Sequence, residues 1–172
     1  MTEGALYDTI TCMYMDSSFD SPGGVRTRDL SADWCQVAAV VAAVDTTLSK
    51  WLAENYGIGL TEYRAALLLG RASGNELRIT ELANRVGLTQ SSVTRLVGRM
   101  ESKHLVVRDT CPDDGRGVYA VITDRGLDAI KEIREPYEAK ICDLLQNAAK
   151  HYPQLDIVDL DHTFETIGKL IS

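Results

Sequence analysis

Apolar residues follow the spacing of a helix face at the start of the patterned part of the chain. Between Ser31, a good N-cap, and Gly57 they recur at alternating steps of three and four positions. The seam they form consists of Trp34, Val37, Val41, Val44, Leu48 and Trp51. It is narrower than the apolar face of most core helices, so we predict that a partner helix covers it in a dimer. An ordinary core helix is the alternative.

Caps and helix breakers predict three shorter helices in the middle of the chain. Thr61 is the expected N-cap of a helix that runs to about residue 73. Residues 81–86 and 89–102 read as two brief helices, and the glycine at position 87 allows a tight turn between them.

The next segment has the pattern of a β-hairpin. Residues 105–107 and 118–122 are rich in β-branched and aromatic side chains, and the segment between them is polar and contains Pro112 and two glycines. The segment 78–80 is long enough only for a very short β-strand.

A long helix is predicted after the hairpin, with Thr123 and Asp124 as its cap. Its expected buried face comprises Leu127, Ile130, Ile133, Tyr137, Ile141 and Leu144. Pro136 implies a kink in this helix, and Pro153 separates a last amphipathic helix from it.

The length and composition of the chain are those of a single globular domain with short additional segments. The chain has 172 residues, of which 45% are hydrophobic and 25% charged. Residues 1–30 lack periodicity and read as a flexible arm. The longest apolar run, residues 37–44, is far too short to span a bilayer, and no signal peptide pattern opens the chain. We therefore expect a cytoplasmic protein without a membrane partner.

Charge is unevenly distributed along the chain. The net charge is -7, yet residues 61–125 hold ten Lys or Arg against eight Asp or Glu. Within that stretch, Arg95, Arg99 and Lys103 lie close together, with Glu101 as the one acidic residue among them. Such a local cluster matters more for phosphate contact than the charge of the whole chain.

The segment from Thr80 to Met100 meets the steric demands of a helix-turn-helix. Ala83 is small where the helices cross, Gly87 can take a positive φ, and Val93 and Leu96 lock the second helix onto the first. With the hairpin that follows, these two helices form a winged helix-turn-helix. The second helix and its cap carry small or hydrogen-bonding groups that fit a major groove, and a solvated polar face is the alternative. The predicted DNA contacts are Thr89, Gln90, Ser91, Ser92, Thr94, Arg95 and Arg99.

Three stretches carry a family resemblance: "LTEYRAALLL", "ITELANRVGLTQSSVTRLVGRMESKHLVVRD" and "CPDDGRGVYAVITDRG". Together they resemble the MarR family of bacterial winged-helix regulators, in a form frequent in actinomycetes. The family's wing motif falls on Asp114 and Arg116, which implies that the arginine enters the minor groove and that the acid orients it. From the residues alone, an arginine flanked by two glycines can also sense a narrow groove, or can be a solvated turn residue.

Chemistry other than DNA binding has few candidates. His162 and Glu165 have the spacing of metal ligands, but no further ligand cluster accompanies them, so we predict neither a metal nor a cofactor. No nucleophile with a visible base stands out, and we expect no enzymatic activity.

The four cysteines lie far apart and are expected to be free thiols. Cys111, in the predicted wing, and Cys12 are candidates for a redox switch, with inert packing as the alternative. By resemblance, a small-molecule effector is the preferred signal. Trp34, Tyr63 and Arg64 are its candidate contacts, and simple packing or surface charge is their alternative.

The sequence thus predicts a mainly α protein: a winged helix-turn-helix with a two-stranded β-wing, embedded in a helical dimerisation domain. Its expected parts are the arm (1–30), a dimerisation helix (31–60), the DNA-binding lobe (61–125) and C-terminal dimerisation helices (126–172). We expect a homodimeric repressor that leaves a pseudopalindromic operator when an effector binds. The alternatives are a cysteine-based redox regulator and a winged-helix module for protein interaction that does not bind DNA.

Overall fold

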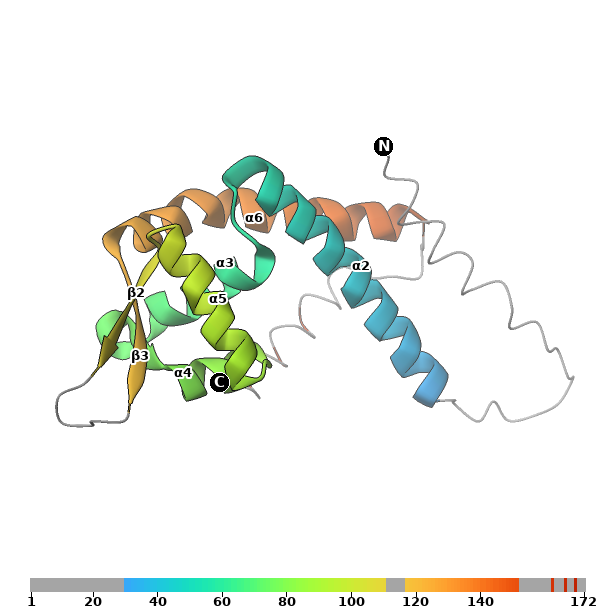
Figure 1. The fold of residues 1–172 in the computed structure, drawn as a ribbon. Helices are drawn as coiled ribbons and strands as arrows, with labels where there is room; N and C mark the ends of the chain where they lie inside the picture. The colour runs from blue at the N-terminus through green and yellow to red at the C-terminus, as the bar shows by residue number, and fades with distance from the viewer. Residues whose placement is uncertain (1–29, 111–116, 152–161, 163–165, 167–168, 170–172) are drawn as a thin grey trace, which may run out of the picture. The chain divides into compact units, whose positions relative to one another are not determined.

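A computed structural model describes residues 30–110, 117–151, 162, 166 and 169 (Figure 1). The chain divides into two compact units, residues 1–50 and 51–172, which are described separately. The fold class predicted from the sequence is confirmed, since the described elements are mostly helices around one small antiparallel sheet. No helix among the described residues is both long and apolar enough to cross a membrane.

Helix α2, Leu30–Tyr56, is the predicted seam helix and begins one residue before the expected cap. The first half of its seam is open to solvent in the chain: Trp34 is 71% exposed, Val37 52% and Val41 54%. The first half of the seam is therefore exposed, whereas farther along Leu48 is buried and Val44 and Trp51 are half-buried.

Helix α3, Leu60–Arg71, has Gly59 and not Thr61 as its N-cap. The prediction of Thr61 was wrong because the cap's backbone N–H finds a carboxylate: it donates to Oε2 of Glu62 at 2.9 Å. A carboxylate three residues into a helix is a common partner for this N–H. A short 3₁₀ turn, Ser73–Asn75, follows the helix.

The strand stub lies at Glu76–Arg78 (β1), two residues earlier than predicted, because Ile79 already begins helix α4, Ile79–Val86. Helix α5, Gln90–Ser102, agrees with the predicted second helix. Strand β1 also pairs, which the sequence did not indicate: it lies antiparallel to β3 (Val118–Ile122), with Leu77 opposite Ala120.

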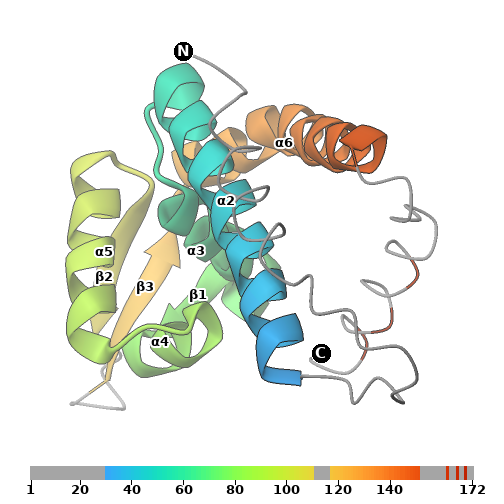
Figure 2. The same cartoon turned by 90° about the vertical axis from the view of Figure 1, so that its right-hand side faces the viewer.

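The predicted hairpin is confirmed as β2 (Val106–Thr110) and β3, joined in antiparallel register with Val106 opposite Ile122. The strand order is β1-β3-β2, so the wing gains a third strand. Figure 2 shows α5 beside this sheet. The core between the helices and the sheet is formed by Leu69, Leu82, Leu96, Val97, Met100, Val106 and Ala120.

Helix α6, Asp124–His151, starts as predicted: the hydroxyl of Thr123 accepts the N–H of Gly126 at 3.1 Å. The helix continues through Pro136. Of the six residues expected to be buried, only Ile133 is fully so, and the others are half-buried. The reason is that α6 packs on α3 near its start, where Ile130 lies close to Gly70. The arm and the helix after Pro153 fall outside the described residues.

Candidate nucleic-acid interface

The turn of the helix-turn-helix has the geometry that its sequence predicts. Gly87 ends α4 with φ +71°, a left-handed conformation that suits glycine. Thr89 then caps α5, where its hydroxyl oxygen accepts the N–H of Ser92 at 3.3 Å. The Thr89 hydroxyl also lies 3.1 Å from Oγ of Ser91 and 2.9 Å from Oγ of Ser92. The first turn of α5 is thereby fixed by a cluster of hydroxyl groups.

Helix α5 has one buried and one exposed face, as the sequence predicts. Its buried face consists of Val93, Leu96, Val97 and Met100, each at most 1% exposed. The predicted DNA contacts are on the surface, with Ser92 half-buried and the others exposed: Thr89, Gln90, Ser91, Thr94, Arg95 and Arg99. This face is continuous and polar.

The two arginines of this face differ in their surroundings. Arg95 forms no ion pair or hydrogen bond with the described part of the chain, so its guanidinium is available to a ligand. Arg99 instead places Nε 3.3 Å from Oε1 of Glu62 on α3. Its contact inside the lobe was not visible in the sequence, because the two residues are far apart along the chain.

Strand β2 contacts the backbone of α5 through Arg108. Its guanidinium donates to the carbonyl of Thr94 at 2.9 Å, and Nε lies 3.4 Å from Oε2 of Glu101. The N–H of Arg108 also donates to Oε1 of Glu101 at 3.1 Å. A Cβ at Gly98 would lie 3.4 Å from the guanidinium, an ordinary contact, so the Arg108 side chain passes close to this point of α5. Sequence reasoning missed this contact, although Arg108 follows Val106 at the two-residue step of one strand face.

A cationic groove of about 330 Å³ lies between α5, the start of α4 and the sheet. The polar residues that line it are Arg78, Thr80, Gln90, Thr94 and Arg108. Two of them, Gln90 and Thr94, were predicted as DNA contacts. Arg78 was not predicted, although its position directly before the first helix of the motif is a usable signal. Its Nε donates to the hydroxyl of Tyr119 at 2.7 Å.

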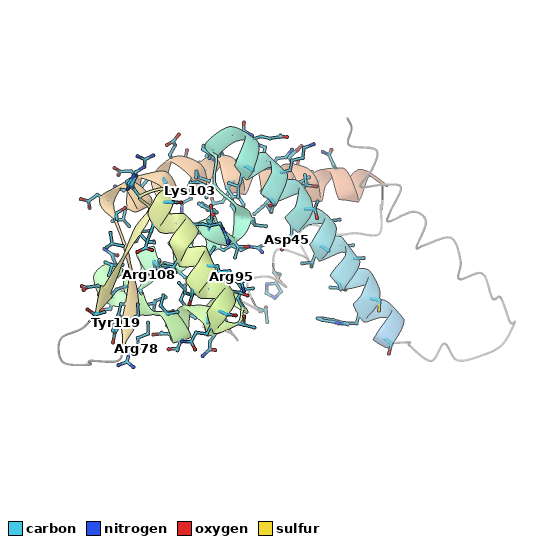
Figure 3. The ribbon with its side chains drawn as sticks, viewed as in Figure 1. Asp45, Arg78, Arg95, Lys103, Arg108 and Tyr119 are labelled. Carbon is cyan, nitrogen blue, oxygen red and sulfur yellow. The ribbon has the colours of Figure 1, made fainter. Side chains whose placement is uncertain are left out.

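Figure 3 shows Arg108 beside α5, and Arg78 with Tyr119 at the end of the sheet away from Lys103. Arg78 of β1 and Arg108 of β2 thus line the same groove as Gln90 and Thr94 of α5, although they are distant in sequence. This collection of cations beside a polar helix face is suited to a polyanion.

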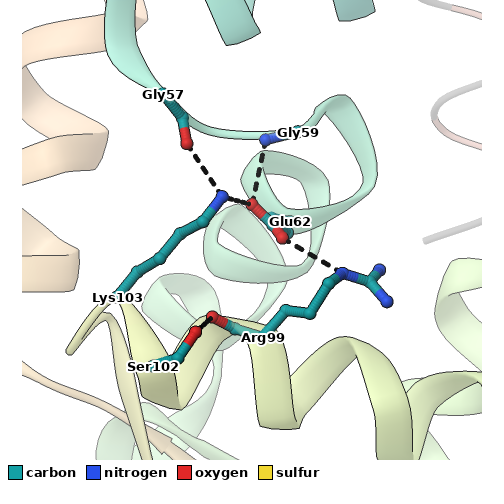
Figure 4. A network of polar contacts seen from close by, with 6 residues as sticks. All are labelled: Gly57, Gly59, Glu62, Arg99, Ser102 and Lys103. Atoms are coloured by element: carbon teal, nitrogen blue, oxygen red, sulfur yellow. Dashed lines mark hydrogen bonds and ion pairs between the residues drawn. The ribbon is translucent and has the colours of Figure 1, made fainter.

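Glu62 is the one buried charged residue among those the structure describes, at 4% exposed. Besides Gly59 and Arg99 it binds Lys103, whose Nζ lies 2.6 Å from Oε2 and also donates to the carbonyl of Gly57 at 2.8 Å (Figure 4). Burial alone would raise the pKa of Glu62. The hydrogen bonds from Lys103, Gly59 and Arg99 and the charge of Lys103 outweigh burial and hold the pKa below its ordinary value.

This cluster joins the C-terminal end of α5 to the loop between α2 and α3. Lys103 was predicted only as part of a basic cluster, and Glu62 not at all as a functional residue. A lone acid three residues after a helix start is the signal that was available.

Several predicted residues are not gathered into this interface. Asp114 and Arg116 of the wing, and Cys12 and Cys111, lie outside the described residues. The other two cysteines, Cys35 and Cys142, are exposed free thiols. In the described part of the chain, no cluster of three His, Cys, Asp or Glu side chains has the arrangement of a metal site.

The candidate effector contacts lie in different environments. Tyr63 is 2% exposed, and its ring packs against that of Tyr137 with centroids 4.9 Å apart. Burial and the neighbouring Tyr137 raise its pKa. Arg64, the next residue, is exposed, and Trp34 belongs to the other unit. Tyr63 therefore packs in the core, where its ring contacts Tyr137 of α6, and its predicted contact with an effector stays a prediction.

Comparisons with known proteins agree with this lobe. Residues 56–117 match the family model described as "MarR family". The HTH-type transcriptional regulator MhqR of Bacillus subtilis is 27% identical over 90 residues, which are 52% of this chain and 61% of MhqR. The chain thus spans about three fifths of this curated relative.

Solved structures share the fold. AbsC, a MarR family transcriptional regulator from Streptomyces coelicolor, matches with a TM-score of 0.68 and 22% identity over 88% of this chain and 96% of AbsC. Sco3205, another MarR family regulator from that organism, was crystallised in complex with DNA and matches with a TM-score of 0.69 and 22% identity over 88% of this chain and 91% of its own. The family model and these structures agree with the winged lobe: residues 56–117, which include the helix-turn-helix, are similar to the MarR family, and the chain shares the fold of the MarR family regulators AbsC and Sco3205.

Proposed function

We propose that the protein binds duplex DNA as a homodimeric repressor and leaves its operator when a small molecule binds. The observation that carries the proposal is the exposed polar face of α5, with Arg95 available, beside a groove that contains Arg78 and Arg108. Side chains of this kind on a recognition helix read base edges, while the flanking cations contact phosphates. In this proposal the protein acts in the cytoplasm, where bacterial DNA lies.

Two proteins of this fold have been crystallised with DNA, which supports the proposal that this protein binds DNA. Sco3205 was crystallised with DNA, and a mutant of MarR from Escherichia coli was crystallised with operator DNA. We propose that Arg95 reads a base in the major groove. Arg116, oriented by Asp114, is proposed to enter the minor groove next to it.

Dimer formation is proposed from the exposed half of the α2 seam. Trp34, Val37 and Val41 leave a large apolar face in water, and their spacing of three and four positions fits a helix from a second copy. Two copies would present two α5 helices about 34–36 Å apart, one turn of DNA. Light scattering should give twice the chain mass of 18.9 kDa, and a persistent monomer would contradict the pseudopalindromic operator.

A small-molecule effector is proposed over cysteine oxidation. The described cysteines, Cys35 and Cys142, lie outside the DNA-facing lobe, on α2 and α6. A protein with all four cysteines replaced by serine should keep its response to the native signal. Loss of that response in Cys111→Ser or Cys12→Ser, with DNA affinity retained, would favour redox sensing instead.

The direct test is selection of bound duplexes from a random library by the full chain. We expect enrichment of a pseudopalindrome whose two half-sites are about one helical turn apart. Recovery of no enriched sequence and no salt-dependent binding to any duplex would favour the protein-interaction alternative.

A further inference from the structure

A second hollow lies away from the polar face of α5, around the loop that joins α2 to α3. It has a volume of about 520 Å³, within the size range of small-molecule sites. Its walls are the end of α2 and the following loop, the residues just after α5, and the first turns of α6. The apolar residues that line it include Tyr56, Ile58, Leu105 and Ile133, and its polar residues are Asn55, Lys103, Arg125, Asp128 and Glu132.

Two of the charged side chains in this cavity already have partners. Lys103 binds Glu62, and Asp128 accepts a hydrogen bond from Lys131 at 3.2 Å. Arg125 and Glu132 form no ion pair or hydrogen bond within the described part of the chain. One cation and one carboxylate therefore remain for a ligand.

The spacing of this pair limits the ligand's length. Arg125 and Glu132 are seven residues apart on α6, so they lie on the same face two turns apart, or about 10 Å along the axis. The apolar lining lies with them in the same cavity. An extended chain of three residues spans a similar distance, at about 3.3–3.6 Å per residue.

We propose that this cavity binds a short apolar peptide of about three residues with both ends free. Its carboxylate pairs with Arg125, its amino group pairs with Glu132, and its side chains cover Tyr56, Ile58 and Leu105. A neutral or singly charged molecule leaves one of the two α6 charges without a partner.

The site is connected to the recognition helix. Gly57, whose carbonyl accepts a hydrogen bond from Lys103, lines the cavity together with Lys103 itself. A ligand seated there contacts the pair that joins the α2–α3 loop to the end of α5. The effect on DNA rests on the proposed function, whereas peptide binding itself does not.

Titration calorimetry on the full chain without DNA tests the site. The probe is the tripeptide Leu-Gly-Leu, with its N-acetylated and C-amidated forms. We expect Arg125→Gln and Glu132→Gln each to weaken binding about tenfold, because each removes one charge-assisted contact. Arg134→Gln, on the same helix and not in the cavity lining, is the matched control and should bind like the parent.

Measuring the binding of the N-acetylated and the C-amidated peptide to each variant identifies the orientation of the bound peptide. Acetylation of the peptide should weaken its binding to the parent about tenfold but should cause little further loss with Glu132→Gln. Amidation of the peptide should likewise weaken its binding to the parent but should cause little further loss with Arg125→Gln. No binding at millimolar peptide, or equal affinity in the parent and both variants, would overturn the proposal. Binding by a protein that recognises no duplex would leave the peptide site standing and reject only the proposed regulatory role.

Discussion

The guanidinium of Arg108 donates a hydrogen bond to the main-chain carbonyl of Thr94, 2.9 Å away. The strand thus binds the backbone of α5, and the contact does not depend on which side chain occupies position 94. Glu101, near the end of the same helix, accepts a hydrogen bond from the backbone N–H of Arg108 and forms an ion pair with its side chain. Together with the buried core between α5 and the sheet, Arg108 fixes the position of β2 against α5.

Arg108→Ala should weaken binding to the selected operator about fivefold to thirtyfold, which is about 1–2 kcal/mol. The loss follows because the wing strands are no longer fixed against α5. Fluorescence anisotropy with a labelled duplex measures it. Val107→Ala, an exposed neighbour on the other face of β2, serves as the control and should bind normally. Equal affinity of the Arg108 variant and the parent would show that the contact positions nothing.

Arg95→Ala should cost about 1–3 kcal/mol of operator binding and relax preference at one base position in each half-site. The guanidinium has no partner in the described lobe, so its removal should leave the fold unchanged. Affinities for the operator and for duplexes mutated at single positions separate this defect from general weakening. Lys131→Ala, on α6, is the charge-matched control. Unchanged specificity in the Arg95 variant would remove α5 from the base-reading surface.

Arg116→Ala should act differently, since its proposed contact is the minor groove. Binding should weaken chiefly at operators with A·T-rich flanks, and the salt dependence should fall by about one phosphate equivalent per subunit. Asp114→Ala should show the same change more mildly, because the arginine remains without its orienting acid. Binding curves at two salt concentrations on A·T-rich and G·C-rich flanks measure both. Equal losses on the two flanks would contradict minor-groove sensing.

Glu62→Gln should lower the free energy of unfolding by about 1–3 kcal/mol at pH 7, since the variant removes the charge that Lys103 and Arg99 face. The folded-state pKa of Glu62 is below its unfolded value of about 4.3. Its stabilisation is therefore complete above that pH and is lost as the pH falls through the lower folded-state value. Urea unfolding at pH 7 and in acid should show the two proteins converging on acidification. A constant difference at all pH values would assign the effect to packing and not to charge.

Gly126→Ala should destabilise the lobe by about 2 kcal/mol or more, because strain in a packed core is among the large mutational effects. A Cβ there would collide with the carbonyl of Leu105 and would lie 2.6 Å from Cγ1 of Ile122. Gly98→Ala is the comparison, since its Cβ meets only the end of a flexible arginine. It should not lower the thermal midpoint and should raise it slightly, since alanine is favoured over glycine inside a helix by about 1 kcal/mol. Similar midpoints for both variants would contradict the crowding at Gly126.

The order of elements was predictable because local signals agreed with tertiary packing. Gly87 and Thr89 specify a turn and a cap by short-range sterics, and the face of α5 that bears Val93 and Leu96 repeats with helix period. The pairing of β1 with β3 was not predictable, since a strand of three residues has almost no pattern of its own. The contacts of Glu62 with α5 were equally hidden, because 37 and 41 residues separate the partners. The periodicity of α5 alone predicted which of its faces is exposed. The groove could not be predicted in this way, because three elements that are distant in sequence form it.

The pairing of β1 with β3 affects how the protein can bind operators that differ in the distance between their half-sites. Because β1 leads directly into α4, and because Arg108 holds β2 to α5, the sheet and the helix-turn-helix behave as one rigid block. Such a block can shift or rotate as a whole, but it cannot widen or narrow its own footprint. If related proteins evolve to bind operators with a new distance between half-sites, we expect the substitutions to lie in α2 and α6. Substitutions in residues 60–110 would mainly alter which bases are read.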